Sequence, residues 1–173
     1  MTTTALLHHR SSTLRRVIRD LEAGADLAWD ADLAAAYGDR RSLLVALHDH
    51  WSRQLLARID VALELGDGSP QESVATAWSS VVRDQPGVRR VLDAASADPA
   101  LKTARRSLLA SVAVAAGLAT FDDPAALSAA AGARFLAGVA AGAARPRTRS
   151  WLVRVLRRLW DGRPPPDPYP WAA

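Results

Sequence analysis

The chain has 173 residues, about half of them hydrophobic, a formal net charge of +4 and no cysteine. This length suits one domain of roughly 100–200 residues, which can bury a core without metal or disulfide support. The lack of cysteine excludes a disulfide scaffold, a cysteine nucleophile, an iron–sulfur cluster and a thiolate zinc site. The first residues lack the features of a signal peptide, so we expect a cytoplasmic protein.

Charge is distributed unevenly along the chain. Residues 1–98 carry 11 Arg or Lys and 14 Asp or Glu, a net charge of −3, whereas residues 99–173 carry 11 and 4, a net charge of +7. Almost every basic residue is arginine, and Lys102 is the only lysine. A charge asymmetry of this kind predicts an anionic partner for the C-terminal part.

The composition predicts an all-α, single-domain bundle of about seven or eight helices, because alanine is the best helix former and abounds here among Leu, Arg and Asp. A first helix is expected over 13–23, capped by Ser11 or Ser12 and ended by Gly24. Asp30 caps a short helix that runs to Tyr37.

The longest predicted helix begins at Asp39 and ends near Leu65. Its apolar residues recur at helical spacing: Leu43, Leu44, Leu47, Trp51, Leu55, Ile59 and Leu63. Ser69-Pro70-Gln71-Glu72 then has the sequence of a capping box with proline at the first helical position. Further helices are expected over 86–95, 99–119 and 124–143.

The last two of these helices are rich in alanine and glycine. The apolar run of the first is only about 13 residues, shorter than the ~20 that a membrane span needs. The second carries Arg134 at its centre, where a charge is costly in lipid. We therefore interpret both as core helices of a bundle or as a dimer interface, and predict no transmembrane helix.

The chain changes character at residue 145, so we divide it into a helical bundle, 1–144, and a basic C-terminal segment, 145–173. Residues 151–160 form an amphipathic helix on a helical wheel. The five partner-binding candidates combine its aromatic and basic residues: Trp151, Arg154, Arg157, Arg158 and Trp160. Such helices bind protein grooves, anionic membranes or nucleic-acid phosphates. A proline-rich tail with polyproline character follows.

Three residues of the longest helix are candidates for a ligand pocket. His48 lies on the apolar side of this helix. It is either a core histidine with a hydrogen-bond partner or a residue that contacts a ligand. Arg58 falls on the same side near Trp51, where it could stack on the indole or meet a buried carboxylate. Arg134 in the alanine-rich helix resembles Arg58 in this respect, and we expect it to form an ion pair with Asp122 or Asp123. Apart from the phosphohydrolase alternative described next, we predict no metal and no cofactor.

The segment LLVALHDHW, which contains His48 and Asp49, resembles part of the H…HD…D metal site of HD-domain phosphohydrolases, which are all-helical. His9 would be the upstream ligand of such a site. Asp93 or Asp98 would supply the final ligand. The resemblance implies a metal-dependent phosphohydrolase as one alternative.

The segment Tyr37-Gly38-Asp39-Arg40-Arg41-Ser42-Leu43-Leu44 resembles the junction that opens the long connecting helix of TetR-type transcriptional regulators. The stretch from Phe121 through Asp123-Pro124 to Gly138 is similar to that family's last two helices, which form a four-helix dimer interface. The resemblance covers residues 37–143 and implies a helical ligand-binding or dimerising body. Only one short helix fits between Gly24 and Tyr37, so no recognition helix of the family's helix-turn-helix is expected.

We therefore predict a non-enzymatic regulatory or interaction protein. It would self-associate through 108–143, as a homodimer, and engage a protein partner or an anionic surface through 145–171. A TetR-like regulator with a reduced DNA-binding region, an HD-type phosphohydrolase and a peripheral membrane-surface protein are the alternatives.

Overall fold

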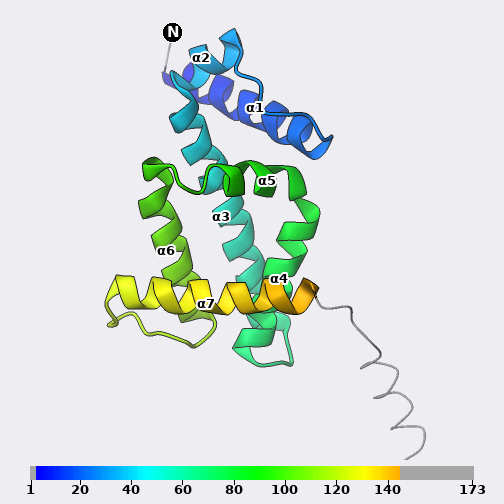
Figure 1. Cartoon of the computed structure of the whole chain (residues 1–173). Coiled ribbons are helices and arrows are strands. Elements are labelled where there is room, and N and C mark those ends of the chain that lie inside the picture. The colour runs from blue at the N-terminus through cyan, green and yellow to red at the C-terminus, as the bar shows by residue number, and fades with distance from the viewer. Residues whose placement is uncertain (1–2, 145–173) are drawn as a thin grey trace, which may run out of the picture. The chain divides into compact units, whose positions relative to one another are not determined.

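The computed structural model describes residues 3–144, with side chains described for residues 7–142. It divides into two compact units, 1–140 and 141–173, and the fold set out below is that of the first. The all-α prediction is confirmed, because the described residues form helices and no strands (Figure 1). The helices are α1 (Thr3–Glu22), α2 (Ala31–Tyr37), α3 (Arg40–Leu65), α4 (Pro70–Asp84), α5 (Pro86–Ala94), α6 (Pro99–Ala115) and α7 (Ala125–Ala144).

Helix α1 begins ten residues earlier than the sequence predicted. Ser11 and Ser12 lie inside the helix and do not cap it. The Ser12 hydroxyl donates to the carbonyl oxygen of His9 at 2.9 Å, which lets a serine remain within a helical turn. The predicted cap was therefore wrong, although the buried stripe through Val17 and Leu21 lies where the sequence placed it.

Helices α2 and α3 begin as predicted, each at an aspartate cap. The Asp30 carboxylate accepts from the amide of Leu33 at 2.8 Å, and the Asp39 carboxylate from the amide of Ser42 at 2.7 Å. Between them Gly38 has a φ of 77°, which glycine tolerates without steric cost. The junction gives α3 a fixed direction, and α3 then contacts α1, α2, α4, α5 and α6.

The N-terminus of α5 is capped from a distant helix. Its own N-cap residue, Gln85, makes no side-chain cap. Instead the Glu22 carboxylate at the end of α1 accepts from the amides of Gly87 and Val88 at 3.0 and 2.9 Å. A Cβ on Gly87 would overlap the backbone of Leu21, so α1 and α5 pack backbone to backbone.

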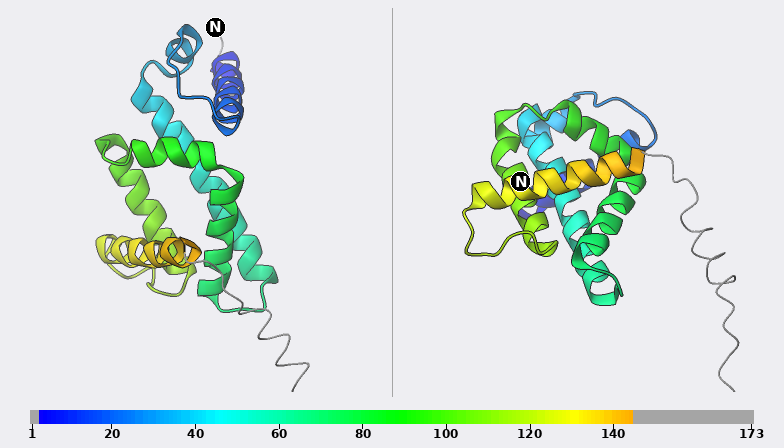
Figure 2. Two further views of the ribbon diagram at one scale, coloured as in Figure 1. Left: turned by 45° about the vertical axis from the view of Figure 1, so that its right-hand side comes forward. Right: turned by 60° about the horizontal axis from the view of Figure 1, so that its bottom comes forward.

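Helix α6 ends at Ala115, four residues before the predicted end, because Gly117 has a φ of 68° and the amide of Leu118 closes the turn on Ala113. Helix α7 then lies across α6 (Figure 2). The two approach closely at Gly132, where a Cβ would overlap the carbonyl oxygen of Leu109. By length and composition alone, one segment of the described chain, Ala125–Gly142, could cross a membrane.

The core is one cluster of large apolar side chains centred on α3. Six of its members come from α3 and are at most 6% exposed: Leu43, Leu44, Leu47, Trp51, Leu55 and Ile59. Side chains of α1, α2, α4, α5 and α6 pack around them, and Leu136 joins them from α7. The predicted stripe is confirmed over these six positions, whereas Leu63 is 38% exposed.

Candidate functional site

A cavity of about 250 Å³ opens where five helices of the first unit converge. It is lined by His48 and Trp51 of α3, Trp78 of α4, Arg89, Leu92 and Asp93 of α5, Arg105, Leu108 and Leu109 of α6, and Ala133, Leu136, Ala137 and Ala140 of α7. We name it the Trp51 pocket. Its α7 wall is mostly alanine, and these short side chains leave the space unfilled. Gaps between the helices of a bundle are common places for small-molecule sites.

Two tryptophans and an arginine form one end of the pocket. The rings of Trp51 and Trp78 meet edge to face, with centroids 5.0 Å apart and planes at 86°. The guanidinium of Arg89 lies 5.2 Å from the Trp51 ring centroid and 5.0 Å from that of Trp78. Asp93 holds it there through two bonds, 2.8 Å from Nε and 2.5 Å from a terminal nitrogen. This end is therefore rigid and aromatic.

Trp51 carries a buried hydrogen-bond donor that has no partner in the described structure. The side chain is 1% exposed, and its Nε1 has no acceptor in the described structure. Buried indole N–H groups usually have a partner, because leaving one unpaired costs about 1–3 kcal/mol. Because this nitrogen has almost no accessible surface, the N–H is enclosed by protein and does not open into the cavity.

His48 contributes a neutral imidazole to the same pocket. It is 5% exposed, and burial holds its pKa below the ordinary value. The nearby Asp49 opposes that shift, whereas the positive charges of Arg105 and Arg89 add to it. The neutral form of the ring is therefore favoured at neutral pH. Its Nδ1 lies 3.3 Å from the hydroxyl of Ser52, one helical turn along α3.

The Ser52–His48 pair has the residue types of a nucleophile and its base, but its surroundings differ from those of a catalytic site. Ser52 is not among the residues that line the Trp51 pocket. No hydrogen bond to a carboxylate orients the imidazole within the described residues, although nucleophile–base pairs normally use a third, orienting group. The geometry favours a packed histidine at the edge of a binding cavity.

Arg105 is the second cation of the pocket. Its guanidinium donates to the carbonyl oxygen of Ser96 at 3.2 Å. No carboxylate of the described residues lies within ion-pairing distance of it, whereas the charge of Arg89 is matched by Asp93. With His48 neutral, the described residues of the lining therefore carry one positive charge that no carboxylate compensates.

The three residues predicted for a ligand pocket are not brought together. His48 and Trp51 line one cavity, but Arg58 lies on another side of α3, among residues that line a shallow groove between α3 and α4. It pairs with Asp84 at 2.6 Å and donates to Ser80, with both members of the ion pair more than 40% exposed. A carboxylate partner was one of the two expectations for Arg58, but this one is not buried.

Arg89 occupies the place over the Trp51 ring that the sequence suggested for Arg58. Sequence reasoning also missed Trp78, Asp93 and Arg105. The spacing of Arg89 and Asp93 could have indicated an i, i+4 ion pair. Nothing local could have shown that this pair lies against two tryptophans from other helices.

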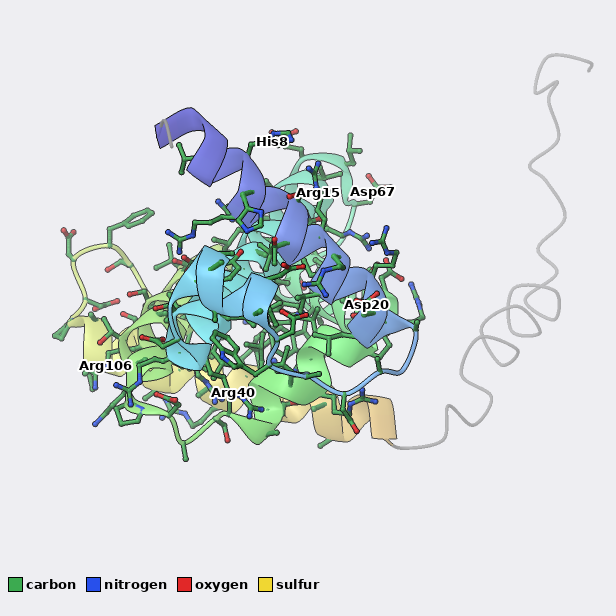
Figure 3. All side chains as sticks on the ribbon, turned by 90° about the horizontal axis from the view of Figure 1, so that it is seen from above. His8, Arg15, Asp20, Arg40, Asp67 and Arg106 are labelled. Carbon is green, nitrogen blue, oxygen red and sulfur yellow. The ribbon has the colours of Figure 1, made fainter. Side chains whose placement is uncertain are left out.

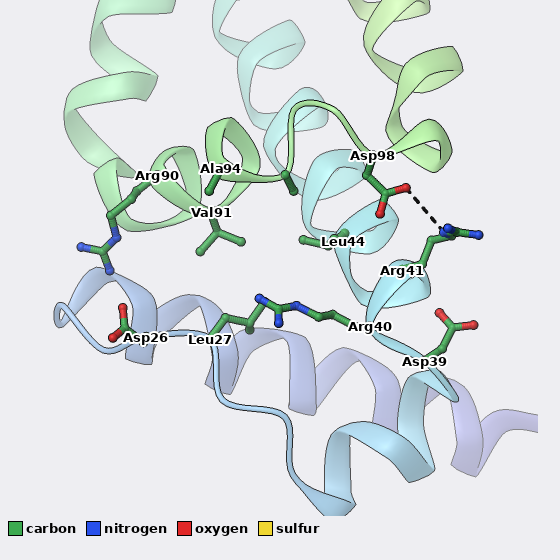
Figure 4. Close-up of a pocket in the computed structure, with 11 residues that line it drawn as sticks. Asp26, Leu27, Asp39, Arg40, Arg41, Leu44, Arg90, Val91, Ala94 and Asp98 are labelled. Carbon is green, nitrogen blue, oxygen red and sulfur yellow. Dashed lines mark ion pairs between the residues drawn. The ribbon is translucent and has the colours of Figure 1, made fainter.

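A larger groove of about 960 Å³ lies between the segment before α2, the start of α3 and α5 (Figure 4). Arg40 extends across it between Leu27 and Leu44 (Figure 4). Arg41 pairs with Asp98 at 3.4 Å, and Arg90 donates to the carbonyl oxygen of Ala25. Three arginines and three aspartates line this groove, so their charges balance, and its charged rim is largely exposed.

The predicted phosphohydrolase site finds no support in the described part of the chain. No group of three or more His, Asp or Glu residues is placed there to hold a metal ion. His48 points into the core while Asp49 is exposed, and both carboxylate oxygens of Asp93 bind Arg89. His9, the expected upstream ligand, is half-buried on α1, and His8 and Arg15 of the same helix lie on the outer surface (Figure 3).

The predicted partner-binding residues of the basic helix lie outside the described residues, namely Trp151, Arg154, Arg157, Arg158 and Trp160. Arg134 is exposed on α7, and no ion pair to Asp122 or Asp123 forms within the described structure. Comparison of the chain with models of known protein families, with curated proteins and with solved structures finds no match.

Proposed function

We propose that this chain is a non-enzymatic helical regulatory protein whose bundle binds a small molecule in the Trp51 pocket. The observation that carries the proposal is the cavity of about 250 Å³ between five helices, which is walled by the rings of Trp51 and Trp78 and by apolar side chains. The walls combine apolar side chains with a few polar groups, as ligand sites do. Because α3 forms one wall of the pocket and the centre of the core, occupancy would act on the packing of the whole unit.

A fragment screen with indole N–H signals as reporter tests this proposal. The chain has six tryptophans, so ¹H–¹⁵N spectra give a small set of indole peaks, and a Trp51→Phe variant identifies that of Trp51. We expect small aromatic and aliphatic fragments to shift the Trp51 and Trp78 peaks. Trp29 on the exposed segment before α2 is the internal control. Fragments that shift no indole peak, or shift Trp29 equally, would contradict the proposal.

A second candidate function, self-association through α7, rests on the exposed face of that helix. Only 22% of the segment Ala125–Gly142 is buried, although the segment is apolar. Its exposed residues are mostly small, and Leu127 and the preceding Phe121 are 65% and 93% exposed. A face of alanine and glycine permits a second helix to approach closely, and a two-fold axis places the same face on both sides of the contact. Arg134 on this face disfavours lipid as the occupant.

Sedimentation velocity tests the second candidate. We expect the full chain to form a dimer that Leu127→Glu dissociates, because a charge would be buried at the contact. Leu65→Glu is the matched control, since Leu65 is 78% exposed at the far end of α3. A monomeric wild type, or a dimer that survives Leu127→Glu, would contradict the proposal. A monomer that partitions onto vesicles would instead support a membrane occupant.

The basic segment 145–173 remains the predicted partner-binding element, and the DNA-binding alternative is tested with it. The test captures binding partners from a lysate with the full chain and, separately, with residues 1–144, and compares what each retains. A protein retained only by the full chain supports the prediction, whereas steeply salt-dependent retention of duplex DNA supports the TetR-like alternative.

A further inference from the structure

The Trp51 pocket offers hydrogen-bond donors but almost no free acceptors. Indole and guanidinium groups donate only. Among the described residues that line the pocket, Asp93 is the one carboxylate, and both of its oxygens already bind Arg89. A ligand that enters this pocket therefore gains more from bringing acceptors than from bringing donors.

The electrostatic balance of the pocket points the same way. Asp93 matches the charge of Arg89, and the imidazole of His48 is buried, which leaves the Arg105 charge without a carboxylate partner in the described structure. Around these groups the walls are apolar, formed by Leu92, Leu108, Leu136 and the α7 alanines. In such a setting one negative charge on a ligand is favoured and a second would lack a counterpart.

Resting on the proposed function, we infer that the ligand of the Trp51 pocket is a small carboxylic acid in its ionised form, with a compact apolar body. The carboxylate accepts from the Arg105 guanidinium, which lines the cavity and has no carboxylate partner among the described residues. The apolar body lies among the leucines and the alanines of α7. A phosphate, with more oxygens and a charge near −2, would need more donors than this lining offers. The cavity of about 250 Å³ falls just below the range of typical drug-sized sites, roughly 300–1,000 Å³, and suits one ring or a short branched chain.

Three probes of nearly equal shape test the inference: phenylacetate, phenylacetamide and 2-phenylethylammonium. Calorimetric titration of the full chain at pH 7.5 gives the three dissociation constants. We expect phenylacetate to bind at least tenfold more tightly than phenylacetamide and the ammonium compound to bind most weakly. Arg105→Gln should remove the preference for phenylacetate while leaving phenylacetamide binding unchanged. Arg106→Gln should leave the preference intact, because Arg106 is exposed and lies outside the lining.

The result separates this inference from the proposed function. Equal binding of phenylacetate and phenylacetamide at the Trp51 indole peak would overturn the carboxylate assignment and leave a neutral ligand pocket. Failure of all three probes would overturn the carboxylate assignment, and the fragment screen would then decide the proposed function independently. If Arg105→Gln unfolds the chain, the side-chain Nε–H signals of arginine in the wild type replace it: we expect phenylacetate to shift the Arg105 signal and phenylacetamide to leave it unchanged, and equal shifts with both would count against the inference.

Discussion

Helices α3 and α7 are both long, 26 and 20 residues, but they are held in place by different means. Helix α3 packs large side chains on several neighbours and supplies the centre of the core. Helix α7 is built mainly from alanine and glycine. Its described residues that are buried are Ser128, Ala129, Gly132 and Leu136.

The comparison separates two ways of stabilising a helix. Large side chains remove apolar area from water, about 25 cal/mol for each Å², and tolerate small shifts of the backbone. Small residues contribute little area but let backbones approach closely, as at Gly132 against Leu109. We therefore expect stability to fall when side-chain volume is removed from the buried face of α3 and when side-chain volume is added to the buried face of α7.

The largest effect is expected for loss of volume in α3. Leu55→Ala should lower the free energy of unfolding by about 2–5 kcal/mol, because Leu55 is fully buried and its removal leaves a cavity. Val61→Ala, on a residue of the same helix that is 54% exposed, should change it by less than about 0.5 kcal/mol. Urea denaturation at fixed protein concentration measures both. Equal costs at the two positions would remove the basis of the comparison.

The next largest effect is expected for an added methyl group in α7. Gly132→Ala should destabilise the chain by about 1–3 kcal/mol, since its Cβ would overlap the carbonyl oxygen of Leu109. Gly138→Ala is the control, because nothing lies within 4 Å of a Cβ there, and should stabilise by roughly 0.5–1 kcal/mol. The same urea series reports both variants. Two changes of the same sign would show that close approach is not what holds α7.

Helix α5 extends the comparison, because its close backbone contact with α1 is reinforced by a carboxylate. Glu22→Gln should cost about 1.5 kcal/mol, since the charged acceptor of two helix amides is lost. Glu64→Gln, at an exposed position of α3, controls for the loss of one negative charge. Thermal unfolding by circular dichroism distinguishes the two. A Glu22 variant as stable as wild type would mean that the packing at Gly87 suffices.

The smallest effect concerns pH and sharpens the description of the α3 core. Burial lowers the pKa of both His48 and His50, so below pH about 6.5 the unfolded chain binds more protons than the folded one. The free energy of unfolding should therefore fall as the pH is lowered from 7.5 to 5.5. Replacing both histidines with glutamine should reduce this slope. His8→Gln, on the exposed surface of α1, is the control. A slope unchanged in the double variant would contradict the prediction.

Local sequence signals predicted the helices well but not the pocket. Aspartate and serine caps, proline at first helical positions and the α3 stripe all act within a few residues, so their consequences could be read from the chain. The start of α1 was missed because serine within a helix can bond backward to the preceding turn. The contact of Arg89 with Trp51 depends on the packing of α5 against α3, which no local pattern records.

Helix α3 is uninterrupted from Arg40 to Leu65, so mechanically it is a stiff rod of roughly 39 Å. Trp51 lies near its midpoint, and the junction with α2 lies at one end. A rod that pivots near its middle magnifies movement at its tips: a tilt of about 5° displaces each end by nearly 2 Å, because each arm spans roughly 20 Å. Any rearrangement around the Trp51 indole that tilts α3 is therefore felt most strongly at its two ends, at the junction with α2 and at the turn into α4, far from where it starts.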